Sequence, residues 1–315
     1  MTPAADPALT EQITALRGDV LAHCYRMLGS LDEAEDLAQE TLVRAWRAAA
    51  SYDPARASLR TWLHRIATNA CLTALEGRAR RPLPSGLGPA GAPDAPLVPR
   101  LDLPWLQPMP DAWVADPALA VQQRQGLRLA FVAALQLLPA RQRAVLVLRE
   151  VLQLPAAEVA DVLGWSVASV NSSLQRARST LRACGPVLEE WREPADPGER
   201  DVVRRYVAAF EAADVPALTA LLAADVVLEM PPVALWLAGA RDYAAFMEAV
   251  FARRGGGWRV ETTRVNDAPT LLTWAPADGG LRPHSVQVLR VAGGLVRANV
   301  TFADPALVER FAGGR

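Results

Sequence analysis

The stretch from Gly164 to Arg182 carries polar and basic side chains at spacings suited to binding nucleic acid. Apolar residues recur along it at helical intervals and leave one face of the helix polar. That face and its flanks carry Ser169, Asn171, Ser172, Ser173, Gln175, Arg176, Arg178 and Arg182. Side chains of these types bond base edges or phosphates, so the stretch predicts a helix that contacts DNA.

The residues just before this helix predict a helix-turn-helix. Small Ala160 stands where two helices would touch, Gly164 suits a left-handed turn, and Val170 falls in the shared core. Ser166 is a good N-cap for the second helix. A helical hairpin with a solvated polar face is the alternative.

Two further clusters have opposite charge. Residues on one face of the helix predicted around residues 32–47 are mainly acidic, which favours contact with protein, although a merely solvated face fits as well. Between Asp53 and Arg81, arginines outnumber acids, and Trp62, Arg65 and Asn69 are spaced to line one side of a helix. Arginine beside an exposed aromatic suits single-stranded nucleic acid, but Trp62 could equally lie in the core.

The C-terminal third offers aromatic and polar residues that could line an apolar ligand pocket. The candidates are Trp236, Tyr243, Met247, Trp258 and Trp274, with Asp242, His284 and Asn299 as polar groups. An enzyme would need Asp242 or His284 as general base, and no motif ties them together. We therefore expect no enzymatic activity, and the aromatics could simply be core.

Several elements must position these residues. Periodicity predicts helices from Leu9 to about Arg81 and again from about residue 118 to 184, including one over 121–138. Closely spaced prolines predict an extended linker over 82–117, and a second linker covers 185–198. From about Glu199 to residue 313 helices mix with strands, the last predicted to alternate with Val296 and Val300 on one face and Asn299 on the other.

Composition limits the class of protein. Of the 315 residues 51% are hydrophobic, so the chain can bury substantial cores, and the net charge of −1 conceals the local clusters. All the basic residues are arginine, which makes any single arginine less informative. We expect no membrane span or leader, hence a cytoplasmic protein, and no cofactor, metal site or disulfide, since Cys24, Cys71 and Cys184 lack ligand spacing.

The motifs together resemble a family. The segments "AEDLAQETLVRAW", "SLRTWLHRIATNACLTAL" and "LPARQRAVLVLREVLQLPAAEVADVLGWSVASVNSSLQRARSTL" resemble the two helical domains of bacterial extracytoplasmic-function (ECF) RNA polymerase sigma factors. "LPWLQPMPDAW" is similar to a segment of members with an extra C-terminal domain resembling SnoaL polyketide cyclases and nuclear transport factor. The resemblance implies a multidomain protein with two all-α domains, over 8–81 and 118–184, and a cone-shaped α+β SnoaL-like domain over 199–313.

The resemblance also implies roles for particular residues. Those expected to bind the large subunits of the polymerase core are Asp36, Gln39 and Glu40. Those expected to bind the promoter −10 element, including a flipped base, are Trp62, Arg65, Asn69, Arg78, Arg80 and Arg81. Those expected to bind the −35 element are Ser169, Asn171, Ser172, Ser173, Arg176 and Arg178, where the family often has a basic residue at one of the two adjacent serines.

The prediction is therefore a sigma factor that directs core polymerase to promoters, with the third domain regulating it in cis, with or without a small ligand in a pocket formed by Trp236, Tyr243, Trp258, Trp274 and His284. Two alternatives stay open. A stand-alone helix-turn-helix regulator would need no polymerase, but would leave the acidic cluster unexplained. A SnoaL-like pocket enzyme with accessory helices would turn over a substrate instead.

Overall fold

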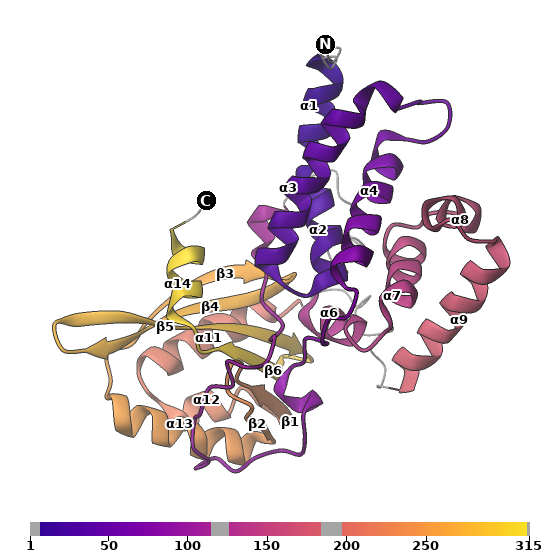
Figure 1. The fold of residues 1–315 in the computed structure, drawn as a ribbon. Coiled ribbons are helices and arrows are strands. Elements are labelled where there is room, and N and C mark those ends of the chain that lie inside the picture. The colour runs from indigo at the N-terminus through magenta and orange to yellow at the C-terminus, as the bar shows by residue number, and fades with distance from the viewer. Residues whose placement is uncertain (1–6, 115–125, 184–196, 314–315) are drawn as a thin grey trace. The chain divides into compact units, whose positions relative to one another are not determined.

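The computed structural model describes residues 7–114, 126–183 and 197–313, and they form two compact units (Figure 1). The helical unit comprises the described residues up to Arg81 and those from Gln107 to Ala183. The C-terminal unit comprises Pro82–Leu106, here called the joining segment, and the described residues from 197 onward. The predicted linker over 185–198 and Cys184 lie almost wholly outside the described residues.

The first part of the helical unit is made of four α-helices. They are α1 (Pro7–Ala15), α2 (Arg17–Leu28), α3 (Leu31–Ala48) and α4 (Leu59–Ala74), with the 3-10 turn η1 (Ala49–Ser51) after α3. Gly29 ends α2 with a φ of 67°, a left-handed conformation that glycine adopts without strain. Ser30 and Ser58 cap α3 and α4 by accepting hydrogen bonds from the backbone N–H groups of Glu33 and Thr61.

The second part contains the helix-turn-helix. Its elements are α6 (Leu129–Leu135), α7 (Ala140–Leu146), the π-helical turn η4 (Val147–Val151), α8 (Ala156–Leu163) and α9 (Val167–Ala183). Gly164 has φ 67° and ψ 36°, and Ala160 and Val170 are buried between α8 and α9, which confirms the predicted motif. The helix predicted over 121–138 is helical only from Leu129 to Leu135, and residues 121–125 lie outside the described part.

The two parts of the helical unit pack against each other. Arg143 of α7 is only 4% exposed, and its guanidinium donates to the carbonyl of Met27 in α2 and to Oε1 of Gln136, the latter at 2.6 Å. Thr61 of α4 donates to Glu158 of α8 at 3.4 Å. Domains that the sequence separates by a linker therefore form one packed body.

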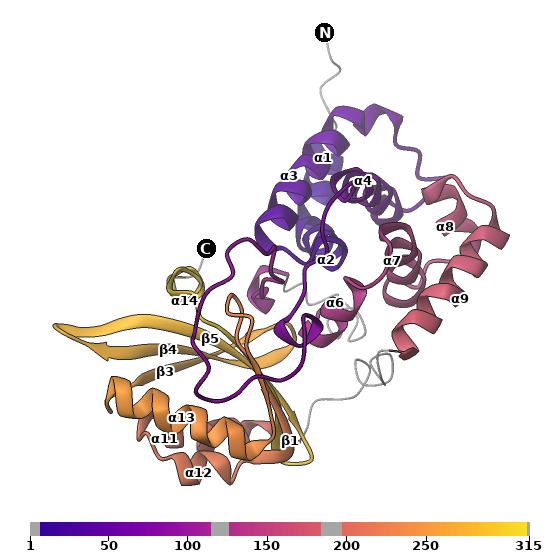
Figure 2. The same ribbon diagram turned by 60° about the horizontal axis from the view of Figure 1, so that its bottom comes forward.

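The C-terminal unit is a six-stranded sheet with helices on both faces (Figure 2). The strand order is β2-β1-β6-β5-β4-β3, and only the β1–β6 pair is parallel. The strands are β1 (Leu222–Glu229), β2 (Trp236–Ala238), β3 (Arg259–Val265), β4 (Ala268–Ala277), β5 (Gly280–Ala292) and β6 (Leu295–Phe302). Helices α11 (Glu199–Glu211), α12 (Val215–Thr219) and α13 (Ala240–Arg254) cover one face, and α14 (Pro305–Ala312) covers the other.

The alternation predicted for the last strand is wrong at one point. The register between β5 and β6 shifts between Arg290, which pairs with Ala298, and Val291, which pairs with Val296. A bulge of this kind turns the side chains beyond it to the other face. Val296 therefore packs in the core under α11–α13, and Asn299, predicted to face away from it, reaches the same side and bonds Tyr206 and Tyr243.

The joining segment packs on the C-terminal unit instead of running freely. It contains the 3-10 turn η2 (Pro84–Gly86), and it is fixed by four hydrogen bonds of 2.8–2.9 Å to β1, β2 and the loop between them. These are Ser85 N–H to Glu229, Trp236 Nε1–H to the Gly88 carbonyl, Gly91 N–H to the Trp236 carbonyl and Arg100 N–H to the Pro232 carbonyl. The predicted linker over 82–117 is thus divided, since residues 107–114, including the 3-10 turn η3 (Asp111–Trp113), belong to the helical unit.

Candidate nucleic-acid interface and ligand pocket

The outer face of α9 presents a polar surface to solvent. Asn171, Ser172 and Arg176 are exposed on it, opposite the buried stripe of Val170, Leu174, Ala177 and Leu181. Ser169 is exposed as well, but its hydroxyl lies 2.9 Å from that of Ser166 at the start of the helix. With Gln175 and Arg182, which are also exposed, the face and its flanks offer amides, hydroxyls and guanidinium groups for groove contacts.

Two of the predicted α9 contacts are engaged inside the protein. Ser173 is only 4% exposed and accepts a hydrogen bond from Arg176 at 3.0 Å, so it faces the helix-turn-helix core and the prediction that it contacts DNA does not fit this structure. Arg178 pairs with Glu150 of η4. Sequence spacing within α9 could not reveal this partner, because Glu150 lies 28 residues earlier in the chain.

The predicted −10 residues of α4 share one exposed stripe. Arg65 and Asn69 are exposed, and Trp62 is half-buried against Tyr52, with ring centroids 5.2 Å apart. Trp62 is thus neither fully buried in the core nor fully exposed. The helix is anchored beneath by Arg60, whose guanidinium bonds the buried carboxylate of Asp19 at 2.5 and 3.1 Å.

Two arginines of the basic loop after α4 pair with an acid of α3. Arg78 and Arg81 both pair with Oε1 of Glu33 in α3, at 2.6 and 2.7 Å. Arg80 is exposed. Surface ion pairs of this kind are worth at most about 1 kcal/mol each, so phosphates can compete for both arginines.

The acidic face of α3 is exposed as predicted from its spacing. Asp36, Gln39 and Glu40 all lie on the solvent side, and Glu40 pairs with Arg44 one turn later at 2.7 Å. At the start of the helix, Gln107 bonds the backbone N–H groups of Leu31 and Asp32 through Oε1 and the Asp32 carboxylate through Nε2. Sequence reasoning missed Gln107, which fixes the N-terminus of α3 from 75 residues away.

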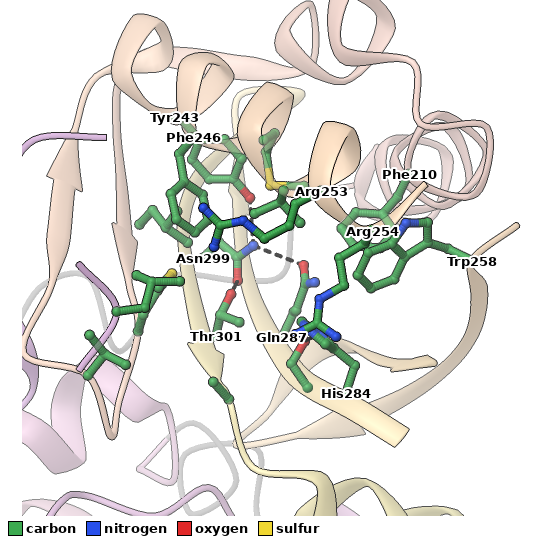
Figure 3. A pocket seen from close by; sticks show the side chains of 18 of the residues that line it. Phe210, Tyr243, Phe246, Arg253, Arg254, Trp258, His284, Gln287, Asn299 and Thr301 are labelled. Atoms are coloured by element: carbon green, nitrogen blue, oxygen red, sulfur yellow. Dashed lines mark hydrogen bonds between the residues drawn. The ribbon is translucent and has the colours of Figure 1, made fainter. Parts of the chain in front are cut away.

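The C-terminal unit encloses a cavity of about 250 Å³ between the sheet and α13 (Figure 3). Three of the five predicted pocket residues, Tyr243, Trp258 and His284, line it. Trp236 and Trp274 do not. Trp236 bonds the joining segment, and Trp274 lies under the guanidinium of Arg259, 4.4 Å from its ring centroid.

The inner end of the cavity is a closed polar network. Asn299 donates to the hydroxyls of Tyr243 at 2.7 Å and Tyr206 at 3.3 Å and to Oε1 of Gln287 at 3.1 Å, while its own oxygen accepts from Thr301 (Figure 3). Burial raises the pKa of both tyrosines, so they remain neutral donors. The network ties four side chains around Asn299 and contains no charged group, which suits orienting a ligand rather than transferring a proton.

The outer end of the cavity carries positive charge. Arg253 and Arg254, at the end of α13, line the cavity; Arg253 points toward Asn299 and Arg254 toward His284, whose ring lies 5.0 Å from that of Trp258 (Figure 3). Burial, with a smaller contribution from Arg254, lowers the pKa of His284 to about 4, so its imidazole is neutral at pH 7. The lining residues include no aspartate or glutamate, and Asp242, the other candidate base, is not one of them.

Other kinds of site receive no support from the described residues. Within residues 7–114, 126–183 and 197–313, no three His, Cys, Asp or Glu side chains are placed to hold a metal ion. Among the same residues, no helix has the length and apolar character that crossing a membrane requires.

Comparison with known proteins places these surfaces in a family. Residues 12–81 match the Sigma-70 region 2 model, residues 128–181 the Sigma-70 region 4 model, and residues 203–299 the SnoaL-like domain model. Region 2 thus runs from within α1 through α4, region 4 covers α6 to α9 including the helix-turn-helix, and the SnoaL-like match covers most of the sheet.

Two relatives match this chain over two thirds or more of its length. The chain is 47% identical over 300 residues to the ECF RNA polymerase sigma factor SigG of Mycobacterium tuberculosis H37Rv, an alignment that covers 94% of this chain and 81% of SigG. It is 32% identical over 216 residues to SigJ of the same strain, covering 68% and 62%. The crystal structure of M. tuberculosis SigJ superposes with a TM-score of 0.65 at 26% identity, covering 94% and 96% of the two chains.

The chain therefore belongs to the ECF RNA polymerase sigma factors. More particularly, it is a transcription initiation factor of the kind that carries a C-terminal SnoaL-like domain, the arrangement to which the SigJ structure corresponds. The predicted family and fold class are thus confirmed.

Proposed function

We propose that this sigma factor docks on core RNA polymerase through the acidic face of α3 and then contacts a promoter in the cytoplasm with α4 and α9. Asp36, Gln39 and Glu40 are exposed together, which supports their role in core binding. Carboxylates on one open helix face suit a basic protein surface and repel DNA.

The promoter contacts are proposed for the residues that remain accessible. Arg65, Asn69 and the half-buried Trp62 would meet unstacked bases of the −10 element, and Arg78 and Arg81 would join them by exchanging Glu33 for phosphates. On α9, Asn171, Ser172 and Arg176 would read the −35 element. Arg178 would contribute less, since it must first leave Glu150.

The C-terminal domain is proposed to act as a brake by holding the joining segment. This segment, about 25 residues long, connects region 2 to the rest of the chain, and its ends meet where Leu106 N–H donates to the Pro82 carbonyl at 3.4 Å. With the segment looped out in this way, regions 2 and 4 stay packed through Arg143, Gln136 and Thr61.

A promoter demands a much larger separation. The −10 and −35 elements lie about 25 base pairs apart, which is ~85 Å along B-form DNA at 3.4 Å per base pair. A released segment of 25 residues would span ~80–90 Å when fully extended and ~25–30 Å on average as a flexible coil. Docking of the joining segment is the observation that carries the proposal, because only release lets both regions reach their elements at once.

The first experiment separates this function from its two rivals. Run-off transcription with core polymerase, with and without the full chain, uses promoters selected from a random-sequence library. A sigma factor yields transcripts only when the chain is added to core. A stand-alone helix-turn-helix regulator would bind the selected DNA without polymerase, and a pocket enzyme would change neither transcription nor DNA binding.

The brake is tested with a matched pair of tryptophan variants. Trp236→Phe removes the indole that donates to Gly88 in the joining segment, whereas Trp274→Phe alters a ring that does not touch that segment. Loss of one hydrogen bond of about 0.5–1.5 kcal/mol shifts the docked population by about 2- to 10-fold. Transcription should rise for Trp236→Phe alone, and equal activity of the two variants would contradict the brake.

A further inference from the structure

The joining segment supplies part of the wall of the cavity. Leu97 and Pro99 line it together with side chains of α13 and the sheet. Pro99 forms an isolated bridge with Val233, and the neighbouring Arg100 N–H donates to the Pro232 carbonyl at 2.8 Å. The cavity is complete only while the joining segment is docked.

The cavity offers hydrogen-bond donors that have no partner among the described residues. Arg253 and Arg254 make no ion pair there, and the side-chain nitrogen of Gln287 makes no hydrogen bond. The neutral imidazole of His284 also lines the cavity, with its Nδ1 3.3 Å from the Ser285 hydroxyl. With no acid in the lining, the cavity attracts an anion, and a guanidinium group matches a carboxylate well.

Apart from the polar network at the inner end, most of the remaining lining is apolar. Phe210, Leu228, Phe246, Met247, Val250 and Trp258 surround the space below the arginines. The volume of about 250 Å³ lies just below the range of about 300–1,000 Å³ usual for ligand pockets, so the occupant is small. An apolar body with one charged end matches both regions.

We propose that this cavity binds a small apolar monocarboxylate, and that the bound ligand holds the joining segment docked and so keeps the sigma factor in its closed form. Its carboxylate pairs with a guanidinium group of Arg253 or Arg254, and its body contacts Leu97 and Pro99. A ligand that touches residues of the docked segment binds the docked state more tightly, and by linkage it shifts the population toward that state. The ligand is thus an inhibitor of promoter binding, an inference that rests on the proposed brake.

Binding is tested with defined probes on the full chain. Octanoate and 4-phenylbutyrate are compared with octanol and 4-phenylbutanol by isothermal titration calorimetry. The carboxylates should bind at least 10-fold more tightly than the alcohols, because a charged hydrogen-bonded group contributes more than a neutral one. Equal binding of acid and alcohol, or binding of neither acid, overturns the assignment of the ligand class.

The arginines are tested by two double variants of equal charge change. Arg253→Gln with Arg254→Gln removes both guanidinium groups from the cavity, while Arg241→Gln with Arg282→Gln removes two exposed arginines that do not line it. The first pair should weaken carboxylate binding by about 10- to 100-fold and leave alcohol binding unchanged. The second pair should bind as wild type, and equal losses in both pairs would overturn the proposed role of Arg253 and Arg254.

Coupling to the joining segment is measured without polymerase, so its result is independent of the transcription assays. Hydrogen exchange at the Gly91 and Arg100 amides, which bond Trp236 and Pro232, should slow at least 5-fold with saturating 4-phenylbutyrate. If 4-phenylbutyrate binds but the exchange rates of these amides do not change, the coupling is overturned and only the ligand site is supported. If exchange slows but transcription is unaffected, the proposed regulation by the joining segment is overturned instead.

Discussion

Gly91 gives the most selective way to loosen the joining segment. A Cβ atom added there would lie 2.4 Å from Cδ1 of Leu235, far inside van der Waals contact. Leu235 is 5% exposed and belongs to the core under α11–α13, so it has little room to withdraw. The backbone of Gly91 is not in the left-handed region, so Gly91→Ala introduces this contact without backbone strain.

The size of the effect follows from overpacking. Forcing a methyl group into a filled site costs about 1–3 kcal/mol. If the docked state bears the whole cost, its population relative to the released state falls by about 5- to 100-fold. The matched control is Gly88→Ala, because a Cβ added at Gly88 meets nothing within 4 Å.

The assay is hydrogen exchange at the Arg100 amide, which reports docking nine residues away from the substitution. Exchange should accelerate by about 5- to 100-fold in Gly91→Ala and stay at the wild-type rate in Gly88→Ala, with transcription rising in the first variant only. The reasoning would be refuted if Arg100 exchanged equally in both variants, since the close contact with Leu235 would then not oppose docking.

Three further predictions concern the other surfaces. Asp36→Arg should weaken binding to core polymerase at least 10-fold, since like charges at an interface cost several kcal/mol. Glu11→Arg on α1 should leave this binding unchanged, and fluorescence anisotropy with core enzyme measures the affinity of both variants. Arg176→Ala should reduce holoenzyme affinity for −35 DNA by about 5- to 100-fold and Arg178→Ala by less, because Glu150 already holds Arg178; equal losses would contradict the ranking. Burial lowers the pKa of His284 to about 4 in the folded protein, below its ordinary value of 6.5. Between these two pH values the unfolded state binds more protons than the folded state, so the free energy of unfolding of the C-terminal unit should fall as the pH drops. From pH 7 to pH 5 this loss is about 2 kcal/mol, and His284→Gln should abolish it. Hydrogen exchange of sheet amides at the two pH values measures the difference in the free energy of unfolding. An unchanged pH dependence in the variant would rule out His284 as its source.

The local elements follow closely from the sequence because their causes are local. Ser30 and Ser58 cap the helices that they precede, and Gly164 takes the left-handed conformation between α8 and α9. The apolar period of α3 faces inward, which leaves Asp36, Gln39 and Glu40 exposed. Such features depend on neighbours three or four residues apart, which the sequence displays directly.

The free or engaged state of a charged side chain is decided by distant residues. Arg78 and Arg81 pair with Glu33, and Arg178 pairs with Glu150, although both acids lie outside the segments that carry these arginines. Arg60 counted toward a basic cluster in the sequence, yet it neutralises the buried Asp19. Ser173 lies on the edge of the polar face, where a small difference in helix rotation buries it.

The pocket shows the same division. Aromatic content predicted a cavity and placed Tyr243, Trp258 and His284 in it, but whether a tryptophan lines a cavity depends on which sheet face it occupies. Trp236 instead holds the joining segment and Trp274 lies under Arg259. The bulge in β6, which turns Asn299 inward, arises from pairing with β5 and has no signal in its own alternating sequence.

The sequence by itself determined the family, the order of the three domains and the helix-turn-helix, because motif spacing and hydrophobic period are properties of contiguous residues. Only the tertiary structure decided the role of the joining segment. Its prolines exclude helix and strand pairing along its own length, and they leave open what it packs against. Its partners, from Glu229 to Trp236, lie well over a hundred residues away. Their contacts hold the segment against the sheet, where it lines the pocket and forms the docked state of the proposed brake.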